Sequence, residues 1–224
     1  MMTFSFVVPC YNARPFVSDC LESILNQKEF DRSEVIVVDD GSNDGSQQVL
    51  KRFSENFGCV RVIEREAPSG RPSVPRNIGM NAAKCEFIIF VDADDMLPQN
   101  YLLAVKRVMA GGADFCSAIP VSFECSQDLV HLENSDVKYL RVPSVAQRFK
   151  NFFSATGLCV RKNQISATSF KNQPLEDWDF VRRLYRDGRR GIILVSPPIF
   201  YRFVYGSISP KNKFQQFKRV FHYF

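Results

Sequence analysis

The sequence predicts an α/β fold in which a mostly parallel central sheet is flanked by helices. Short apolar runs alternate with stretches of helical periodicity from residue 3 to residue 120, and this alternation is typical of βαβ units. Two of the apolar runs, 34–39 and 87–91, lead directly into aspartates. Because parallel strands end at the same edge of a sheet, and ligands bind there, these acids predict a polar binding site at that edge.

The individual elements follow from the spacing of the apolar residues. Runs rich in β-branched and aromatic residues predict strands, and apolar residues three or four apart predict helices. On this basis a strand at 4–8 is followed by a helix at 16–27, a strand at 34–39, a helix at 46–57 and a strand at 60–63. Prolines in 67–75 indicate a loop, and a helix at 77–84 and strands at 87–91 and 115–122 come next. A second patterned region adds a strand at 158–160, a helix at 178–186 and strands at 192–195 and 199–203.

These elements predict one domain over 1–210 followed by a short C-terminal helix. The first patterned region covers 1–122, and the second covers 151–210. Between them, 123–150 is polar and has no clear period, so it is expected to be a variable excursion. A chain of 224 residues is long enough to bury a sizeable core in a single domain.

The charge distribution excludes a general nucleic-acid-binding surface. The net charge is +5, and the segment 211–224 contains four basic residues and no acid. The rest of the chain is therefore close to neutral, whereas a nucleic-acid-binding protein carries basic residues over its body.

The cysteines and the N-terminus predict a cytoplasmic protein. The seven cysteines are scattered and form no C-x₂-C pair, which excludes a typical zinc site or disulfide framework and favours reduced thiols. The chain begins without the basic and apolar regions of a signal peptide. No apolar run approaches the roughly 18 residues that span a bilayer.

The most informative segment is the acidic turn after 87–91. Asp92, Asp94 and Asp95 crowd three carboxylates into four positions, and such a cluster is relieved by a divalent cation. Carboxylate oxygens are suited to Mg²⁺ or Mn²⁺, which complete their coordination with substrate phosphates. The alternative is a solvated acidic turn before Pro98.

Other segments suggest functional roles, each beside a structural alternative. In 39–42, Asp40 and Gly41 could receive a ligand, or could form a plain turn with Ser46 as the helix N-cap. Arg71 and Arg76 lie near a helix start that favours phosphate, or are ordinary surface arginines.

Carboxylates are the expected catalytic groups. Glu176 and Asp177 precede Trp178 at a helix start, where an acid could serve as a general base or simply offset the helix dipole. The only histidines, His131 and His222, lie in the excursion and the tail. A Ser-His-Asp site is therefore poorly supported.

The segment 211–224 predicts a basic amphipathic helix. Its aromatic and aliphatic residues share one stripe, and its basic residues lie opposite. Such a helix can bind an anionic membrane surface, here the inner face, as a peripheral contact. Docking on the protein's own core and self-association are equally open. The sequence ends inside this helix, so a truncated chain is one expectation.

Six segments, taken in order, resemble the motifs of inverting family 2 glycosyltransferases, which have the GT-A fold. They are 8–12 (VPCYN), 37–42 (VVDDGS), 76–79 (RNIG), 91–95 (VDADD), 157–161 (GLCVR) and 176–179 (EDWD). The resemblance covers most of 3–120 and returns over 154–209. It implies transfer of a sugar from a nucleotide-diphosphate donor, a UDP-sugar, to a hydroxyl of a glycan or lipid-linked acceptor in polysaccharide biosynthesis.

The resemblance also implies a division of labour between the two patterned regions. The first would bind the donor: Pro9 and Tyr11 would line the nucleoside pocket, Asp40 would bind the base and Asp92 would face the ribose. Asp94, in the family's DXD motif, would hold the Mn²⁺ or Mg²⁺ that bridges the diphosphate.

The remaining implied roles belong to three arginines and to the general base. Arg71, Arg76 and Arg202 would lie on the donor side. In the second region Asp177 would remove the proton of the acceptor hydroxyl, with Glu176 as its rival for that role.

One position departs from the family pattern. The segment 201–209 resembles the closing Y-R-x-H-x-G-S motif, but Val204 stands where many members carry a histidine that assists at the metal. A non-catalytic homologue that binds nucleotide sugars therefore stays open as an alternative. A sugar nucleotidyltransferase is a second one, although the glycine-rich basic loop it requires is not found near Pro9.

Overall fold

The computed structural model describes residues 2–123, 136–146, 151–165 and 169–202. The predicted helix at 211–224, Val204 and both histidines lie outside these ranges, as does most of the predicted excursion. No helix within the described residues is long and apolar enough to cross a membrane.

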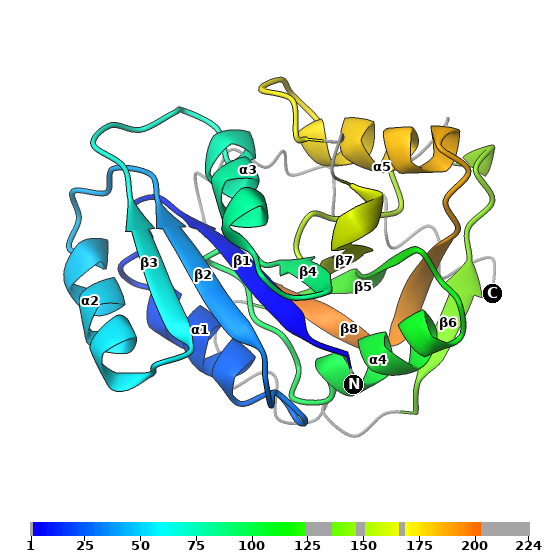
Figure 1. Ribbon diagram of the computed structural model, residues 1–224, viewed down its shortest axis with the longest axis horizontal. Coiled ribbons are helices and arrows are strands. Elements are labelled where there is room, and N and C mark those ends of the chain that lie inside the picture. Colours follow the sequence, from blue (N-terminus) through cyan, green and yellow to red (C-terminus); the bar gives the residue numbers. More distant parts are fainter. Residues whose placement is uncertain (1, 124–135, 147–150, 166–168, 203–224) are drawn as a thin grey trace.

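The described chain forms one sheet with flanking helices (Figure 1). The strands are β1 (Phe4–Cys10), β2 (Glu34–Asp39), β3 (Val60–Glu64), β4 (Phe87–Phe90), β5 (Phe115–Phe123), β6 (Lys138–Arg141), β7 (Leu158–Arg161) and β8 (Gly191–Arg202). The helices are α1 (Val17–Leu25), α2 (Ser46–Asn56), α3 (Ser73–Ala82), α4 (Tyr101–Ala110) and α5 (Glu176–Arg186), with a 3₁₀ turn, η3 (Lys162–Gln164), after β7.

The strand order is β3-β2-β1-β4-β7-β5-β8-β6. The strands β3, β2, β1 and β4 run parallel, as predicted. Beyond β4 the sheet is mixed, because β7 pairs antiparallel with both β4 and β5. The pair β5 and β8 is again parallel, and β6 pairs antiparallel with β8 at the edge.

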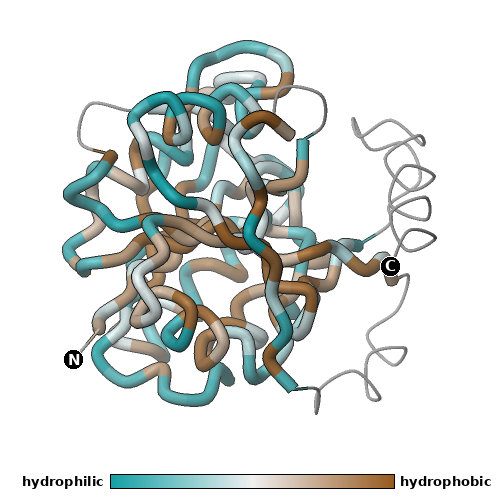
Figure 2. The backbone as a smooth tube through the Cα atoms, turned by 90° about the vertical axis from the view of Figure 1, so that its right-hand side faces the viewer, coloured by the Kyte–Doolittle hydropathy of each residue, from teal (hydrophilic) through white to brown (hydrophobic). Residues whose placement is uncertain are grey.

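Alternation along β1 explains the layers. Phe4, Phe6 and Val8 belong to the same core cluster as the buried faces of α1, α2 and α4. Val7 points to the other face, where the buried residues of α5 and Met80 of α3 form a second cluster. Two helical layers therefore cover the sheet, and Figure 2 shows the hydrophobic strands running through the middle of the molecule.

The helix α3 approaches the sheet closely at Gly79. A Cβ atom at this position would lie 2.4 Å from Cγ1 of Val7 in β1, so a larger side chain would push the helix away. This contact brings the N-terminal half of α3, and with it Arg76, close to the ends of the parallel strands.

Apart from shifts of one or two residues at the ends of several elements, the sequence-based expectation differs from the structure at four places. The helix α3 begins at Ser73 rather than at 77, because Pro75 falls in its first turn, where a missing N–H does no harm. The predicted strands 192–195 and 199–203 are one strand, β8, whose register shifts near its prolines. The helix α4 and the edge strand β6 were not predicted.

Candidate functional site

The candidate site lies where β2, β1 and β4 end together. The chain crosses from β3 to β4 on the other side of β1, so the strand order reverses at this point, which is where open α/β sheets bind ligands. The backbone N–H of Asp40 donates to Cys10 O at 2.7 Å, and that of Val91 donates to Val7 O at 3.0 Å. Pro9, Asp40 and Asp92 are thus held at one edge, as the sequence predicted.

The loop after β1 is fastened to the turn after β2. Asn12 N–H donates to Ser42 Oγ, and Asn43 N–H donates back to Asn12 Oδ1, both at 2.9 Å. These reciprocal bonds hold Asn12 at a φ of 50°, a left-handed conformation that asparagine tolerates. They also fix the start of the loop, from which Tyr11 projects with half of its surface exposed.

Ser46 takes part in the same connection. Its hydroxyl accepts a hydrogen bond from Ala13 N–H at 2.9 Å. The N-cap of α2 is Gly45, with no side-chain cap hydrogen bond. The expected alternative of Ser46 as the N-cap is therefore not found, and its hydroxyl joins two loops instead.

The adjacent acids Asp39 and Asp40 have different surroundings. Asp39 is fully buried and accepts hydrogen bonds within its own turn, from Ser42 N–H at 3.3 Å and Gln47 Nε2 at 3.1 Å. Asp40 is also buried, and its Oδ2 accepts from Ser69 N–H at 2.9 Å and from Ser69 Oγ at 2.6 Å. Its Oδ1 pairs with the guanidinium of Arg65. Asp39 therefore stabilises the turn, whereas Asp40 faces the loop after β3.

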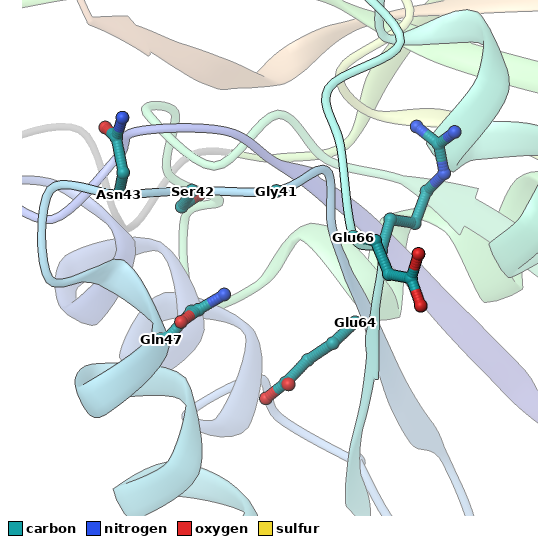
Figure 3. Close-up of a pocket in the computed structure, with 7 residues that line it drawn as sticks. Gly41, Ser42, Asn43, Gln47, Glu64 and Glu66 are labelled. Carbon is teal, nitrogen blue, oxygen red and sulfur yellow. The ribbon is translucent and has the colours of Figure 1, made fainter.

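A polar pocket lies between the turn after β2 and the end of β3 (Figure 3). Its lining residues are Gly41, Ser42, Asn43, Gln47, Glu64, Arg65 and Glu66. In Figure 3 the side chains of Gln47 and Glu64 extend into the space between α2 and β3. Arg65 belongs both to this lining and to the ion pair with Asp40, so the pocket and the buried carboxylate share one residue.

In the acidic turn after β4, Asp95 has a structural position. It is buried, and it accepts hydrogen bonds from Thr156 Oγ1 at 2.6 Å and from Arg202 N–H at 3.0 Å. Burial and, after it, the charges of Asp94 and Asp92 raise the pKa of Asp95 well above its usual range. Asp95 therefore holds the turn and is not available to a ligand.

Asp92 and Asp94 are only partly buried and remain accessible. Burial and, after it, the Asp92 carboxylate raise the pKa of Asp94 to about 6. Asp92 itself is paired with Arg76, whose Nη2 lies 2.5 Å from Asp92 Oδ1. Of the three acids, Asp94 is thus the one that is partly exposed, crowded by the charge of Asp92, and in no arginine salt bridge among the described residues, since Asp92 is paired with Arg76 and Asp95 is buried.

Arg76 connects the acidic turn to α5. Its Nη2 pairs with Asp92, and its Nη1 pairs with Glu176 Oε1 at 2.8 Å. The guanidinium is buried and also lies over the ring of Phe170, 5.5 Å from its centroid. Burial alone would lower the pKa of Arg76, but the charges of Asp92 and Glu176 raise it above its usual value. One buried cation therefore joins two segments that are 84 residues apart in sequence.

The helix α5 presents Asp177 beside this ion-pair network. Leu175, its N-cap residue, adopts a left-handed φ of 58°, is half exposed and makes no side-chain cap hydrogen bond. Such backbone strain in a residue other than glycine is concentrated at functional sites. Asp177 is buried, and its Oδ2 accepts a hydrogen bond from Asn151 Nδ2 at 3.2 Å. Glu176 and Asp177 therefore differ, since one faces a cation and the other a neutral amide.

Two predicted residues lie apart from this group. Arg71 is exposed, and its carbonyl accepts a hydrogen bond from Ser69 Oγ at 2.9 Å. Arg202 is buried behind the acidic turn, where it pairs with Asp19 of α1 at 2.7 Å. The structure thus brings most of the predicted residues together but leaves these two at the margin of the site.

The structure also adds residues that sequence reasoning missed. Arg65, Ser69, Asn151 and Thr156 each bind one of the site carboxylates. Of these four, only Thr156 could have been suspected from the sequence, because it directly precedes the segment 157–161 that carries the family resemblance. The others come from irregular segments, where no periodicity indicates which way a side chain points.

Comparison with known proteins identifies the family. The family described as glycosyl transferase family 2 matches residues 5–172, which is most of the chain. The chain belongs to glycosyltransferase family 2. The predicted membership and GT-A fold are thereby confirmed.

Curated members of family 2 match this chain over part of their length. The poly(ribitol-phosphate) beta-glucosyltransferase of Bacillus spizizenii is 42% identical over 103 residues, which are 46% of this chain and 16% of that protein. The minor teichoic acid biosynthesis protein GgaA of Bacillus subtilis is 29% identical over 212 residues, 89% of this chain and 47% of that protein. The chain thus spans less than half the length of either relative.

Solved structures share the GT-A fold at low sequence identity. TarS of Staphylococcus aureus, residues 1–349 in complex with UDP-GlcNAc, gives a TM-score of 0.77 at 22% identity, over 98% of this chain and 65% of that one. The mannosyltransferase PcManGT of Pyrobaculum calidifontis, in complex with GDP-Man and Mn²⁺, gives 0.69 at 20% identity, over 97% and 59%. At these identities the likeness concerns the fold.

The acidic turn of this family 2 member fits a divalent cation that is held partly by its substrate. Among the described residues no group of three or more His, Cys, Asp or Glu side chains is placed to hold a metal. Mg²⁺ and Mn²⁺ do not require such a group, because they bind through one or two carboxylates together with substrate phosphates. Asp94 meets this requirement, because it is crowded by the charge of Asp92, whereas the carboxylate of Asp95 is taken up by the hydrogen bond from Thr156.

Proposed function

We propose that this protein transfers a sugar from a UDP-sugar to a hydroxyl of a glycan or lipid-linked acceptor, with inversion, in the synthesis of a cell-surface polysaccharide. The observation that carries the proposal is the buried Arg76, which joins the acidic turn of the donor half to the carboxylate pair of α5. The names of related proteins support this class of reaction and donor. One is a poly(ribitol-phosphate) beta-glucosyltransferase, and TarS is solved with UDP and UDP-GlcNAc.

The donor would lie across the ends of β2, β1 and β4. Pro9 and the half-exposed ring of Tyr11 would line the nucleoside side, and Asp40 would accept a hydrogen bond from the base. Asp40 is buried and already bound by Ser69 and Arg65, so the base would displace one of these contacts to reach its carboxylate. Asp92 would bind the ribose, and the exposed Arg71 is available to the phosphates from the loop side.

Asp177 is the better candidate for the general base. To accept a proton, Glu176 would give up the charge that faces the buried Arg76, which is unfavourable. Asp177 is held by the neutral Asn151 and can take a proton without breaking a salt bridge. Both residues lie in the first turn of α5 and both charges act on Arg76, but of the two it is Glu176 that forms the salt bridge, and this difference decides between them.

Asp94 would hold a divalent cation, Mn²⁺ or Mg²⁺, together with the donor diphosphate. The chemistry that this cation supplies is electrostatic stabilisation of the charge on the departing UDP. The acids around Asp94 have separate tasks, since Asp95 fixes the turn and Asp92 is paired with Arg76. A Mn²⁺ complex in the structural neighbour PcManGT agrees with a divalent cation in general.

A donor panel tests the proposal. The protein is incubated with UDP-sugars and Mn²⁺, and release of UDP is measured with and without candidate acceptors. We expect one or a few UDP-sugars to turn over and EDTA to abolish turnover. Absence of both turnover and binding across the panel would contradict the proposal, and metal-dependent turnover would exclude a homologue that only binds nucleotide sugars.

The assignment of the base is tested by replacing Asp177 and Glu176 separately. Asp177→Asn is expected to lower kcat by about 10²–10⁴, the range of general base catalysis, while donor affinity stays nearly unchanged. Glu176→Gln keeps a hydrogen-bond partner for Arg76 and should lower kcat much less. Loss of donor binding in Asp177→Asn to the same extent as turnover would indicate a structural role instead.

A further inference from the structure

Arg202 is buried behind the acidic turn with its donors directed at the protein. Its Nε donates to the carbonyl oxygen of Asp94 at 3.1 Å. Its Nη2 pairs with Asp19 Oδ2 at 2.7 Å and lies 3.7 Å from Sδ of Met96. One complete edge of the guanidinium is therefore occupied by α1 and by the acidic turn itself.

Aromatic rings enclose the same guanidinium. Its carbon atom lies 5.1 Å from the ring centroid of Phe16 and 4.6 Å from that of Phe123. Only 8% of the Arg202 side chain is exposed. An arginine that binds phosphate presents its fork to the ligand, whereas this fork faces the interior.

The strand β8 holds the turn at further points. Met96 and Phe200 exchange two backbone hydrogen bonds of 2.9 Å. The backbone N–H of Arg202 donates to Asp95 at 3.0 Å. Together with the bond from Arg202 Nε to the carbonyl of Asp94, these contacts anchor the chain from Asp94 to Met96.

We propose that Arg202, held in place by Asp19, is a positioning residue that fixes the backbone of Asp94 and so aims its carboxylate at the cation, and that it does not ligate the donor diphosphate. This inference rests on the proposed function, because it assigns a task toward the cation that Asp94 would hold. Outer partners that orient a metal ligand typically affect metal affinity by about 10- to 100-fold. Asp19, which lies on α1, is linked to the site through its ion pair with Arg202.

The proposal predicts that Asp19 and Arg202 act on the cation as a unit. Asp19→Asn removes the charge that orients the guanidinium, and Arg202→Lys removes the donor at the Nε position but keeps the positive charge. Binding of Mn²⁺ in the presence of UDP is followed by the paramagnetic resonance of free Mn²⁺. Each single variant should weaken Mn²⁺ binding by about tenfold. The Mn²⁺ affinity of the double variant should equal that of the more affected single variant.

Binding of UDP in EDTA distinguishes positioning from phosphate contact. We expect UDP affinity measured by calorimetry without metal to change by less than about twofold in all three variants. Arg161→Lys is the matched control, since Arg161 also combines an ion pair, with Glu86, and a ring contact, with Phe87, but at the opposite end of β4. It should leave both measurements unchanged. Thermal unfolding of each variant verifies that it is folded.

Three results would overturn the inference. Loss of UDP affinity in EDTA in Arg202→Lys but not in Asp19→Asn would make Arg202 a phosphate ligand. Additive losses of Mn²⁺ affinity would make the two residues independent, and unchanged Mn²⁺ affinity would remove the positioning role. If the unaltered protein turned over UDP-sugars while the variants bound Mn²⁺ normally, only this inference would fail. If the unaltered protein bound no Mn²⁺ with UDP, the proposed function would fail together with it.

Discussion

The acidic turn is held from two sides by buried arginines that work differently. On the α3 side Arg76 contacts two carboxylates of the site, Asp92 and Glu176. On the β8 side Arg202 contacts a carbonyl of the turn and the carboxylate of Asp19, whose side chain is 40% exposed. The first arrangement joins two carboxylates from different segments, and the second contacts the backbone of the turn. Similar burial of two arginines therefore does not imply a similar role.

The largest expected effect comes from removing the cation that joins two site acids. Arg76→Met leaves Asp92 and Glu176 without their partner, and breaking a buried pair in this way typically destabilises by about 3–5 kcal/mol. Arg202→Met leaves only Asp19, which water can reach, so its loss should resemble that of a hydrogen bond to a charged group, about 1.5–3 kcal/mol. Urea unfolding of both variants measures the difference, and equal losses would contradict the distinction.

A smaller effect is expected from displacing α3 without touching a charge. Gly79→Ala places a Cβ 2.4 Å from Val7 Cγ1, and overpacking of this kind typically costs about 1–3 kcal/mol. Because Arg76 lies on α3, the displacement should move Arg76 and so reduce UDP-sugar turnover. Mn²⁺ affinity should stay the same, because the proposed positioning of Asp94 depends on Arg202 of β8.

Gly58→Ala is the matched control for this change. A Cβ at Gly58 meets no atom within 4 Å, so stability and turnover should be nearly unaltered. If Gly79→Ala behaved like Gly58→Ala, the close approach of α3 would have no role in placing Arg76.

The smallest effect on stability is expected from replacing Asp19, the more exposed partner in the ion pair with Arg202. Asp19 is 40% exposed, and Asn at this position keeps a side-chain oxygen that can accept from the buried Arg202, so the loss should be that of one ordinary hydrogen bond, about 0.5–1.5 kcal/mol. Asp19→Asn should therefore lower the urea midpoint only slightly even though it weakens Mn²⁺ binding. A loss of stability as large as that of Arg76→Met would show that the pair is structural.

The sequence was sufficient for the parts of the fold that have strong periodicity. The strand at 34–39 was predicted with the bounds that the structure has, because four consecutive β-branched apolar residues, 35–38, are followed at once by two aspartates and a glycine. The helix α4 has a clear apolar face but was not predicted. The edge strand β6 gave no signal, since all four of its residues are exposed and show no alternation.

The candidate site was predictable in its composition but not in its connections. The positions of Asp40 and Asp92 follow from strand ends that meet at one edge. That Arg76 would face two acids, and that Arg202 would turn inward towards Asp19, depends on how α3 and β8 pack on the sheet. Such contacts join residues up to 183 positions apart, and no local pattern encodes them.

Arg76 couples the acidic turn to the start of α5, and a double-mutant cycle on its two partners measures this coupling. Asp92→Asn and Glu176→Gln are made singly and together, and the free energy of unfolding is measured for each. Either single variant leaves Arg76 one of its two salt bridges, whereas the double variant removes both from a buried cation. The double loss is expected to exceed the sum of the single losses by at least about 1 kcal/mol. Losses that add to within about 0.5 kcal/mol, as at independent sites, would contradict it.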